Sequence, residues 1–254
     1  MKASYDAAAA KCRHEVFAIA AECRRDNRKF RDSFFNIEVD LDLGTRDCLD
    51  SICVDSEGKP HGHDYVPSCA KRVTEIFDDP KFFINPPTAE DVVQGLGRDC
   101  WLIAAISSLT AIPGMIEKLC VASDAEVGVY GFVHFRDGEW VHTIVDDFLY
   151  LTNPDFDSVD ELHQTSLLAI SNPDGMDPRK WYAKQCQSNS PALYFAKCRN
   201  PQETWLPLLE KCFAKATGDY AALNGGFSGD AIEDMTGGIT SEIYTSDILD
   251  KVGL

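Results

Sequence analysis

Residues 94–101 read Gln-Gly-Leu-Gly-Arg-Asp-Cys-Trp, and an apolar stretch with helical spacing follows them directly. Asp99 is a residue type that favours the N-cap of a helix, where its carboxylate accepts hydrogen bonds from first-turn N–H groups. Cys100 then occupies the first helical position. The unsatisfied N–H groups and the helix dipole at that position favour the thiolate, which is the nucleophilic form of cysteine. The segment therefore predicts a helix that begins at a nucleophilic cysteine.

A second polar residue of this segment has the chemistry of an oxyanion donor. Gln94 precedes Cys100 by six residues, across a glycine-rich turn. Its side-chain amide and the backbone N–H of Cys100 can together stabilise the oxyanion that forms when a thiolate attacks a carbonyl. The alternative is that Cys100 is a buried structural cysteine, which needs no base. The residues alone leave both interpretations open.

The segments that follow predict helices and a β-hairpin. A helix is expected over 99–119, interrupted at Pro113-Gly114. Its predicted apolar face consists of Trp101, Ala104, Ala105, Ser108 and Leu109. Alternating segments at 131–135 and 140–145 flank an Asp-Gly turn, with His134 and His142 expected at the surface or as cross-strand neighbours. A further helix is expected over 205–216.

The N-terminal part predicts a helix and then a strand. Apolar residues at three- and four-residue spacing predict a helix over 4–32, and strict alternation predicts a strand over 35–43. Prolines near residues 80 and 86 suggest a boundary, which gives a lead-in region (1–77) and a core region (78–254). The mixture of helices and a short antiparallel sheet indicates an α+β fold.

Composition excludes several classes of protein. The 254 residues carry 41 acids against 24 bases, a net charge of -17, which argues against nucleic acid or an anionic membrane surface as a partner. No apolar run approaches the roughly 20 residues of a membrane-spanning helix. Ten cysteines without a CxxC motif or a secretory signal indicate reduced thiols and a cytoplasmic location. A zinc site is a remote alternative, because the spacing of the cysteines and histidines between 48 and 69 matches no common pattern.

Residues 94–110 resemble the active-site segment of the calpain family of papain-like cysteine proteases. Four further segments resemble parts of the same core in the same order: 78–84, 138–147, 205–215 and 225–238. The resemblance covers about residues 75 to 250. The amino-acid sequences of these segments are most similar to those of fungal calpain-like proteins. It implies the N-terminal lobe of a calpain-type core, with a central helix that carries the cysteine and a short antiparallel sheet. It also implies cleavage of protein or peptide substrates through a thioester at Cys100, with Gln94 as the oxyanion donor and Trp101 as a packing residue.

The resemblance places the base of the reaction outside this sequence. In the calpain family the catalytic histidine and its orienting asparagine lie in a second, C-terminal lobe. None of the six histidines here has a Gly-His-Ala-Tyr-like context, no Asn-Pro-Trp-Gly string occurs, and the sequence ends at Leu254. We therefore expect a C-terminal protease lobe as partner and no activity from this chain alone. The alternative is a non-catalytic truncated paralogue that acts as an interaction module.

The resemblance also implies calcium dependence. Asp91 and Glu203 match the carboxylate positions of a calcium site, and oxygen ligands suit this hard cation. The alternative is that both acids are solvated or pair with lysine or arginine. One residue departs from the family pattern, because Arg98 stands where members usually have glycine. If that position requires a positive φ, arginine strains the turn.

Overall fold

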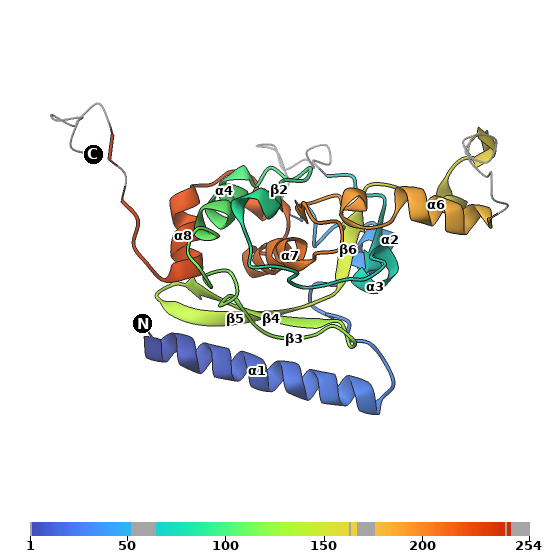
Figure 1. The fold of residues 1–254 in the computed structure, drawn as a ribbon. Coiled ribbons are helices and arrows are strands. Elements are labelled where there is room, and N and C mark those ends of the chain that lie inside the picture. Colours follow the sequence, from blue (N-terminus) through green and yellow to red (C-terminus); the bar gives the residue numbers. More distant parts are fainter. Residues whose placement is uncertain (1, 52–64, 163, 167–175, 242, 245–254) are drawn as a thin grey trace.

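The computed structural model describes residues 2–51, 65–162, 164–166, 176–241 and 243–244 (Figure 1). These residues form a mixed α+β fold with small antiparallel sheets, as the sequence predicts. The helices are α1 (Lys2–Arg25), α2 (Ile37–Leu43), α3 (Val73–Ile76), α4 (Cys100–Leu109), α6 (Pro178–Cys186), α7 (Trp205–Thr217) and α8 (Ser228–Thr236). The strands are β1 (Cys69–Arg72), β2 (Val92–Val93), β3 (Cys120–Asp124), β4 (Val129–Arg136), β5 (Glu139–Asp146), β6 (Phe148–Leu151) and β7 (Lys197–Cys198).

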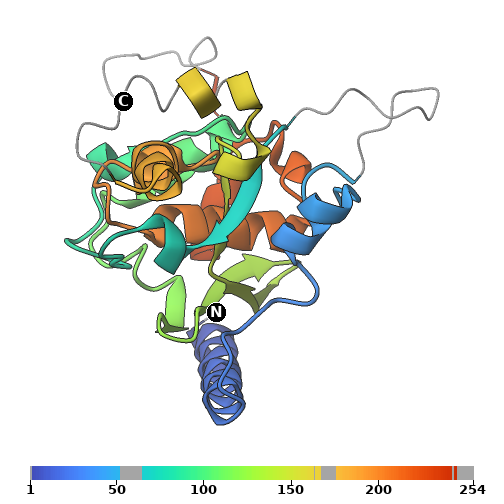
Figure 2. The same cartoon turned by 90° about the vertical axis from the view of Figure 1, so that its right-hand side faces the viewer.

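The sheet β3-β4-β5 separates the N-terminal helix from the rest of the fold. Figures 1 and 2 show α1 on one side of this sheet and α7 and α8 on the other. The buried face of α1 packs against apolar residues of the sheet. At Gly131 a side chain would overlap Cys12 and Val16, so glycine permits the close approach of helix and sheet. The predicted helix is confirmed but ends at Arg25, because Asn27 adopts a positive φ of 48°.

The predicted strand over 35–43 is wrong, because residues 37–43 form helix α2. Local caps override the alternating pattern. The side chain of Asn36 accepts a hydrogen bond from the backbone N–H of Val39, and Gly44 ends the helix with a φ of 68°. Asp40 is buried on α2 and accepts hydrogen bonds from the backbone N–H groups of Asp47 and Cys48. Asp40 is therefore an internal anchor of the loop that follows α2.

The predicted hairpin is confirmed by the pairing of β4 with β5. Asp137 and Gly138 form its two-residue turn, and their φ values of 52° and 86° match the backbone that such tight turns require. The surface placement of His134 is wrong, because this side chain is buried and packs against Phe213 of α7. Burial lowers the pKa of His134 to about 4.

Helix α4 is the central helix that the sequence predicts, but it is shorter and presents a different face. It ends at Leu109, and residues 110–119 form turns around Pro113, which cannot continue a helix. The buried residues are Leu102, Ile103, Ala105, Ile106 and Leu109, whereas Ala104 and Ser108 of the predicted face are exposed. The larger aliphatic side chains decide which face turns inward, since they remove more apolar surface from water.

Packing crosses the expected boundary at residue 78. Strand β1 pairs antiparallel with β6, with Ala70 opposite Tyr150. Buried residues from both sides of the boundary, including Ile37, Leu49 and Tyr65 before it, form one continuous core. The division into 1–77 and 78–254 stays a prediction. Among the described residues no helix is long and apolar enough to cross a membrane.

Candidate active site

Cys100 is exposed at the first residue of α4. The backbone carbonyl of Asp99 accepts hydrogen bonds from the N–H groups of Leu102 and Ile103, at 2.9 and 3.1 Å, which starts the helix. The predicted side-chain cap by Asp99 is wrong, since its carboxylate makes no capping hydrogen bond. This side chain is instead buried and contacts the carboxyl group of Glu210 on α7. The helix start therefore exposes the thiol and buries the acid beside it.

The loop from Gln94 to Asp99 is held closely against the segment that precedes β7. The backbone N–H of Leu96 donates to the carbonyl of Tyr194 at 2.9 Å, and β2 pairs with β7 just before the loop. A side chain at Gly95 would overlap the backbone of Phe195, so only glycine fits this approach. The expected strain at Arg98 is absent, because Arg98 is not among the described non-glycine residues with positive φ.

The structure brings Gln94 into the same loop as Cys100. Its side chain is exposed, and Nε2 donates a hydrogen bond to the carbonyl of Gly97 at 2.9 Å. A primary amide carries two N–H groups, so one donor remains beyond this contact. The side chain is thus anchored within the loop and keeps one further amide donor.

Trp101 connects the helix start to the glycine-rich segment. Its indole Nε1 donates to the carbonyl of Leu223 at 2.7 Å, and a side chain at Gly226 would lie 2.6 Å from the indole ring. Arg98 accepts a hydrogen bond from the N–H of Gly225 at 3.1 Å through its backbone carbonyl. The packing role expected for Trp101 agrees with these contacts, which fix one wall beside Cys100.

Asp91 and Glu203 lie close enough for their charges to interact. Asp91 accepts from the backbone N–H and the hydroxyl of Thr88, at 2.8 and 2.7 Å. Glu203 is buried and accepts from the backbone N–H of Ile84 at 2.9 Å. Burial raises the pKa of Glu203, and the charge of Asp91 raises it further. Within the described part of the chain neither acid forms an ion pair with lysine or arginine.

Three histidines fall within the described residues, and their surroundings do not suit a base for Cys100. His134 is buried beside Thr143, His142 contacts Glu15 of α1 at 2.9 Å, and His14 is exposed on α1. His61, His63 and His163 lie outside the described residues. The remote zinc alternative depends on two of these and on Cys53, which is also outside them. No group of three metal-binding side chains occurs in the ranges that the structure describes.

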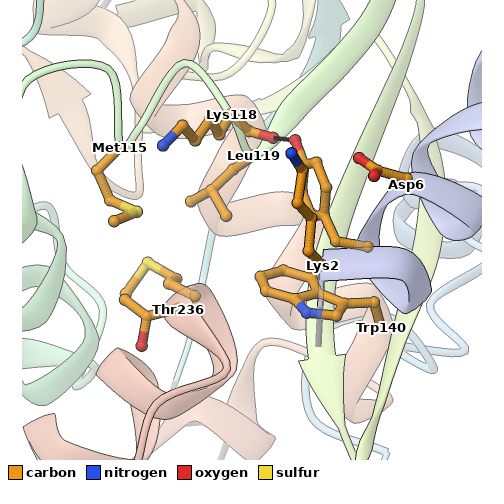
Figure 3. Close-up of a pocket in the computed structure, with 9 residues that line it drawn as sticks. Lys2, Asp6, Met115, Lys118, Leu119, Trp140 and Thr236 are labelled. Carbon is orange, nitrogen blue, oxygen red and sulfur yellow. Dashed lines mark hydrogen bonds between the residues drawn. The ribbon is translucent and has the colours of Figure 1, made fainter.

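An apolar pocket of about 350 Å³ lies between α1, β5 and α8 (Figure 3). Tyr5 and Trp140 line it, with ring centroids 5.0 Å apart, and the Tyr5 hydroxyl donates to the carbonyl of Lys118. Met115 and Met235 complete its apolar wall. None of its lining residues belongs to the loop that carries Gln94 and Cys100, so this pocket is separate from the candidate active site.

Sequence reasoning missed two residues that organise the site. Glu210 contacts Asp99, and the hydroxyl of Tyr65 accepts a hydrogen bond from the backbone N–H of Arg98 at 3.1 Å. A signal for Glu210 was present, since it lies on the apolar stripe of α7, four residues after Leu206 and three before Phe213. No pattern marked Tyr65, which reaches the site only through the tertiary fold.

The loop thus combines an exposed cysteine at a helix N-terminus with a glutamine amide. Residues 50–169 and 183–252 match the family model described as calpain family cysteine protease. The chain is 32% identical to the bovine calpain-1 catalytic subunit over 67% of this chain and 19% of that protein. It is 30% identical to the human calpain-1 catalytic subunit over 87% of this chain and 25% of that protein.

A further match is the human calpain-2 catalytic subunit, 32% identical over 66% of this chain and 19% of that protein. This chain thus spans roughly a fifth to a quarter of the length of the curated relatives that it matches. With a family model that covers most of its residues, the chain belongs to the calpain family of cysteine proteases.

Proposed function

We propose that this chain is the nucleophile-bearing lobe of a calpain-type endopeptidase that cleaves peptide bonds of protein substrates in the cytoplasm. The observation that carries the proposal is the exposed thiol of Cys100 at the first residue of α4, in one loop with Gln94. Nine described cysteines are free thiols, which suits a reducing compartment.

In the proposed reaction the Cys100 thiolate attacks the carbonyl carbon of the scissile peptide. The carbonyl oxygen becomes an oxyanion, which the amide of Gln94 and the backbone N–H of Cys100 stabilise. The C–N bond then breaks, the amine leaves with a proton from a histidine supplied by a second lobe, and a thioester remains on Cys100. Water attacks the thioester, releases the acid product and returns the thiol.

The absence of a suitably placed base among the described histidines supports a shared active site. We expect no measurable peptide hydrolysis by the 254-residue chain alone, because none of its six histidines has the Gly-His-Ala-Tyr-like context of the family's base. An extended chain that continues into a histidine- and asparagine-bearing lobe should cleave a fluorogenic peptide, and its Cys100→Ala variant should not. Equal turnover by the extended chain and this variant would contradict the proposal and favour a non-catalytic interaction module.

We further propose that Asp91 and Glu203 bind calcium. The residues fit a hard cation, because two interacting carboxyl groups, one of them buried, have no basic side chain to neutralise them in the described structure. The ion would link the loop before Gln94 to the start of α7. When bound, it would supply positive charge that compensates this pair and fixes the two segments relative to each other.

A further inference from the structure

A pair of buried acids lies directly behind the candidate nucleophile. Asp99 precedes Cys100 and is 2% exposed, and Glu210 on α7 is 1% exposed. The Oε2 atom of Glu210 accepts a hydrogen bond from the backbone N–H of Ala196 at 2.9 Å. Neither carboxylate oxygen of Asp99 accepts a hydrogen bond from an N–H or O–H donor elsewhere in the described structure. The carboxyl group of Glu210 lies beside that of Asp99, so a proton on Glu210 would supply the donor that the Asp99 carboxylate lacks.

Two ionised carboxylates offer only acceptors, so a hydrogen bond between them requires one proton. Burial raises the pKa of Glu210 well above its ordinary value, and the charge of Asp99 raises it further. Burial raises the pKa of Asp99 as well, but the neighbouring Glu210 lowers it, so we place the shared proton on Glu210 and the negative charge on Asp99. A charge at Asp99 is favoured by its place at the N-terminus of α4, where the helix dipole is positive.

The surroundings of the pair contain few other ionisable groups. Tyr65 from the lead-in region, Tyr220 after α7, and Arg98 on the cysteine loop interact electrostatically with it or with its neighbours. Burial raises the pKa of Tyr65 to about 12, and that of Tyr220 is also raised, so both tyrosines are neutral near pH 7. Neither tyrosine therefore adds a charge to the pair near pH 7.

The pair joins three segments that build the site. Asp99 begins the cysteine helix, Glu210 belongs to α7, and Ala196 follows Phe195, whose backbone contacts Gly95 in the Gln94 loop. One carboxyl group on α7 thus contacts both the helix start and the strand segment that supports the oxyanion loop.

We infer that Glu210 is a positioning residue for the nucleophile: its carboxyl group donates one shared proton to Asp99, and this hydrogen bond fixes the entry into α4 and hence the place of Cys100. The inference rests on the proposed role of Cys100. When hydroxide removes the proton, water forms and two adjacent buried carboxylates remain. Their repulsion displaces the helix start, so loss of this proton as the pH rises loosens the site.

The variant Glu210→Gln tests this directly, because its amide donates to Asp99 permanently while its carbonyl still accepts from Ala196. The folded wild-type pair binds one proton that the unfolded chain releases. Stability is therefore fully present below the ordinary glutamate pKa of 4.5 and is lost as the pH rises toward the raised value. From urea unfolding at stepped pH values above 4.5, the unfolding constant of wild type relative to Glu210→Gln should rise by up to about tenfold per pH unit until the pH reaches the raised pKa. A change below about threefold across this range would overturn the inference.

A second readout separates positioning from mere stability. Iodoacetamide labelling of Cys100 at pH 7, mapped by mass spectrometry, should slow about tenfold in Glu210→Ala and stay within about twofold of wild type in Glu210→Gln, because the glutamine keeps the hydrogen bond. Asp234→Asn is the matched control: Asp234 on α8 has its pKa raised to about 6, mainly by burial, and its variant should leave the labelling of Cys100 unchanged. If Glu210→Ala does not fold, the pH dependence of unfolding of wild type relative to Glu210→Gln still tests the inference.

The outcomes also separate this inference from the proposed function. Equal labelling of Cys100 in all folded variants, with a fast wild-type rate, would overturn the positioning role and leave the nucleophile standing. Slow labelling of Cys100 in wild type would instead count against the nucleophile.

Discussion

Replacing Lys211 with methionine should destabilise the chain far more than the same change at Lys215, one turn later on α7. Lys211 is fully buried, and its ammonium donates to the Asp146 carboxylate at 2.5 Å and to the carbonyl of Phe148 at 2.8 Å. Asp146 in turn accepts from the backbone N–H of Asp32 at 2.8 Å, which attaches the N-terminal region to the sheet. The lysine therefore neutralises a carboxylate that cannot reach water.

The size of the effect follows from what the substitution leaves behind. Methionine fills a similar volume but leaves Asp146 buried and unpaired, and breaking a buried ion pair in this way costs about 3–5 kcal/mol. Lys215 pairs with Asp32 at 2.5 Å, but its side chain is 22% exposed, so water can solvate what remains. For that variant we expect about 1 kcal/mol.

Urea unfolding followed by far-UV circular dichroism measures both variants under identical conditions. A difference of about 2 kcal/mol or more corresponds to at least roughly a thirtyfold difference in the unfolding constants. Equal losses in the two variants would refute the reasoning, because they would show that the buried position of Lys211 carries no electrostatic role.

Three further predictions concern metal, pH and backbone fit. Millimolar calcium should raise the melting temperature of wild type, and magnesium should raise it less. The Asp91→Asn substitution should remove most of the calcium effect. A wild-type melting temperature that calcium does not change would count against the site. Because burial lowers the pKa of His134 from 6.5 to about 4, protonation favours the unfolded chain, so wild type should lose roughly 3 kcal/mol relative to His134→Leu as the pH falls from 7 to 4. Parallel stability curves would contradict this. Gly95→Ala should lower the free energy of unfolding by about 1–3 kcal/mol and slow the labelling of Cys100, since the alanine side chain would overlap the Phe195 backbone. A variant with the melting temperature and the labelling rate of wild type would show that position 95 does not require glycine.

Local signals in the sequence were sufficient to place three elements. The start of α4 at Cys100, the Asp-Gly hairpin and α7 all follow from residue types whose preferences act over a few positions. The alternating pattern at 35–43 failed because it ignored the caps at Asn36 and Gly44. A period-two pattern over nine residues is too short to outweigh caps at both ends of a helix.

The parts that could not be predicted depend on contacts between distant segments. Asp99 has the composition of an N-cap, yet Glu210 on α7 draws its side chain inward, and no local pattern encodes that meeting. His134 is buried because α7 covers the hairpin. The proximity of Asp91 and Glu203 came from the resemblance to calpains, since residues 112 positions apart carry no mutual signal in a single sequence.

The most direct test of the account is the order in which the ten cysteines react. Native wild-type chain is treated with limiting iodoacetamide at pH 7, quenched over time, and mapped by mass spectrometry. Cys100 should be modified first, because it is exposed at a helix N-terminus, whereas Cys12, Cys198 and Cys212 are buried and burial raises the pKa of each thiol. Modification of Cys100 no faster than these buried thiols would contradict its assignment as the nucleophile.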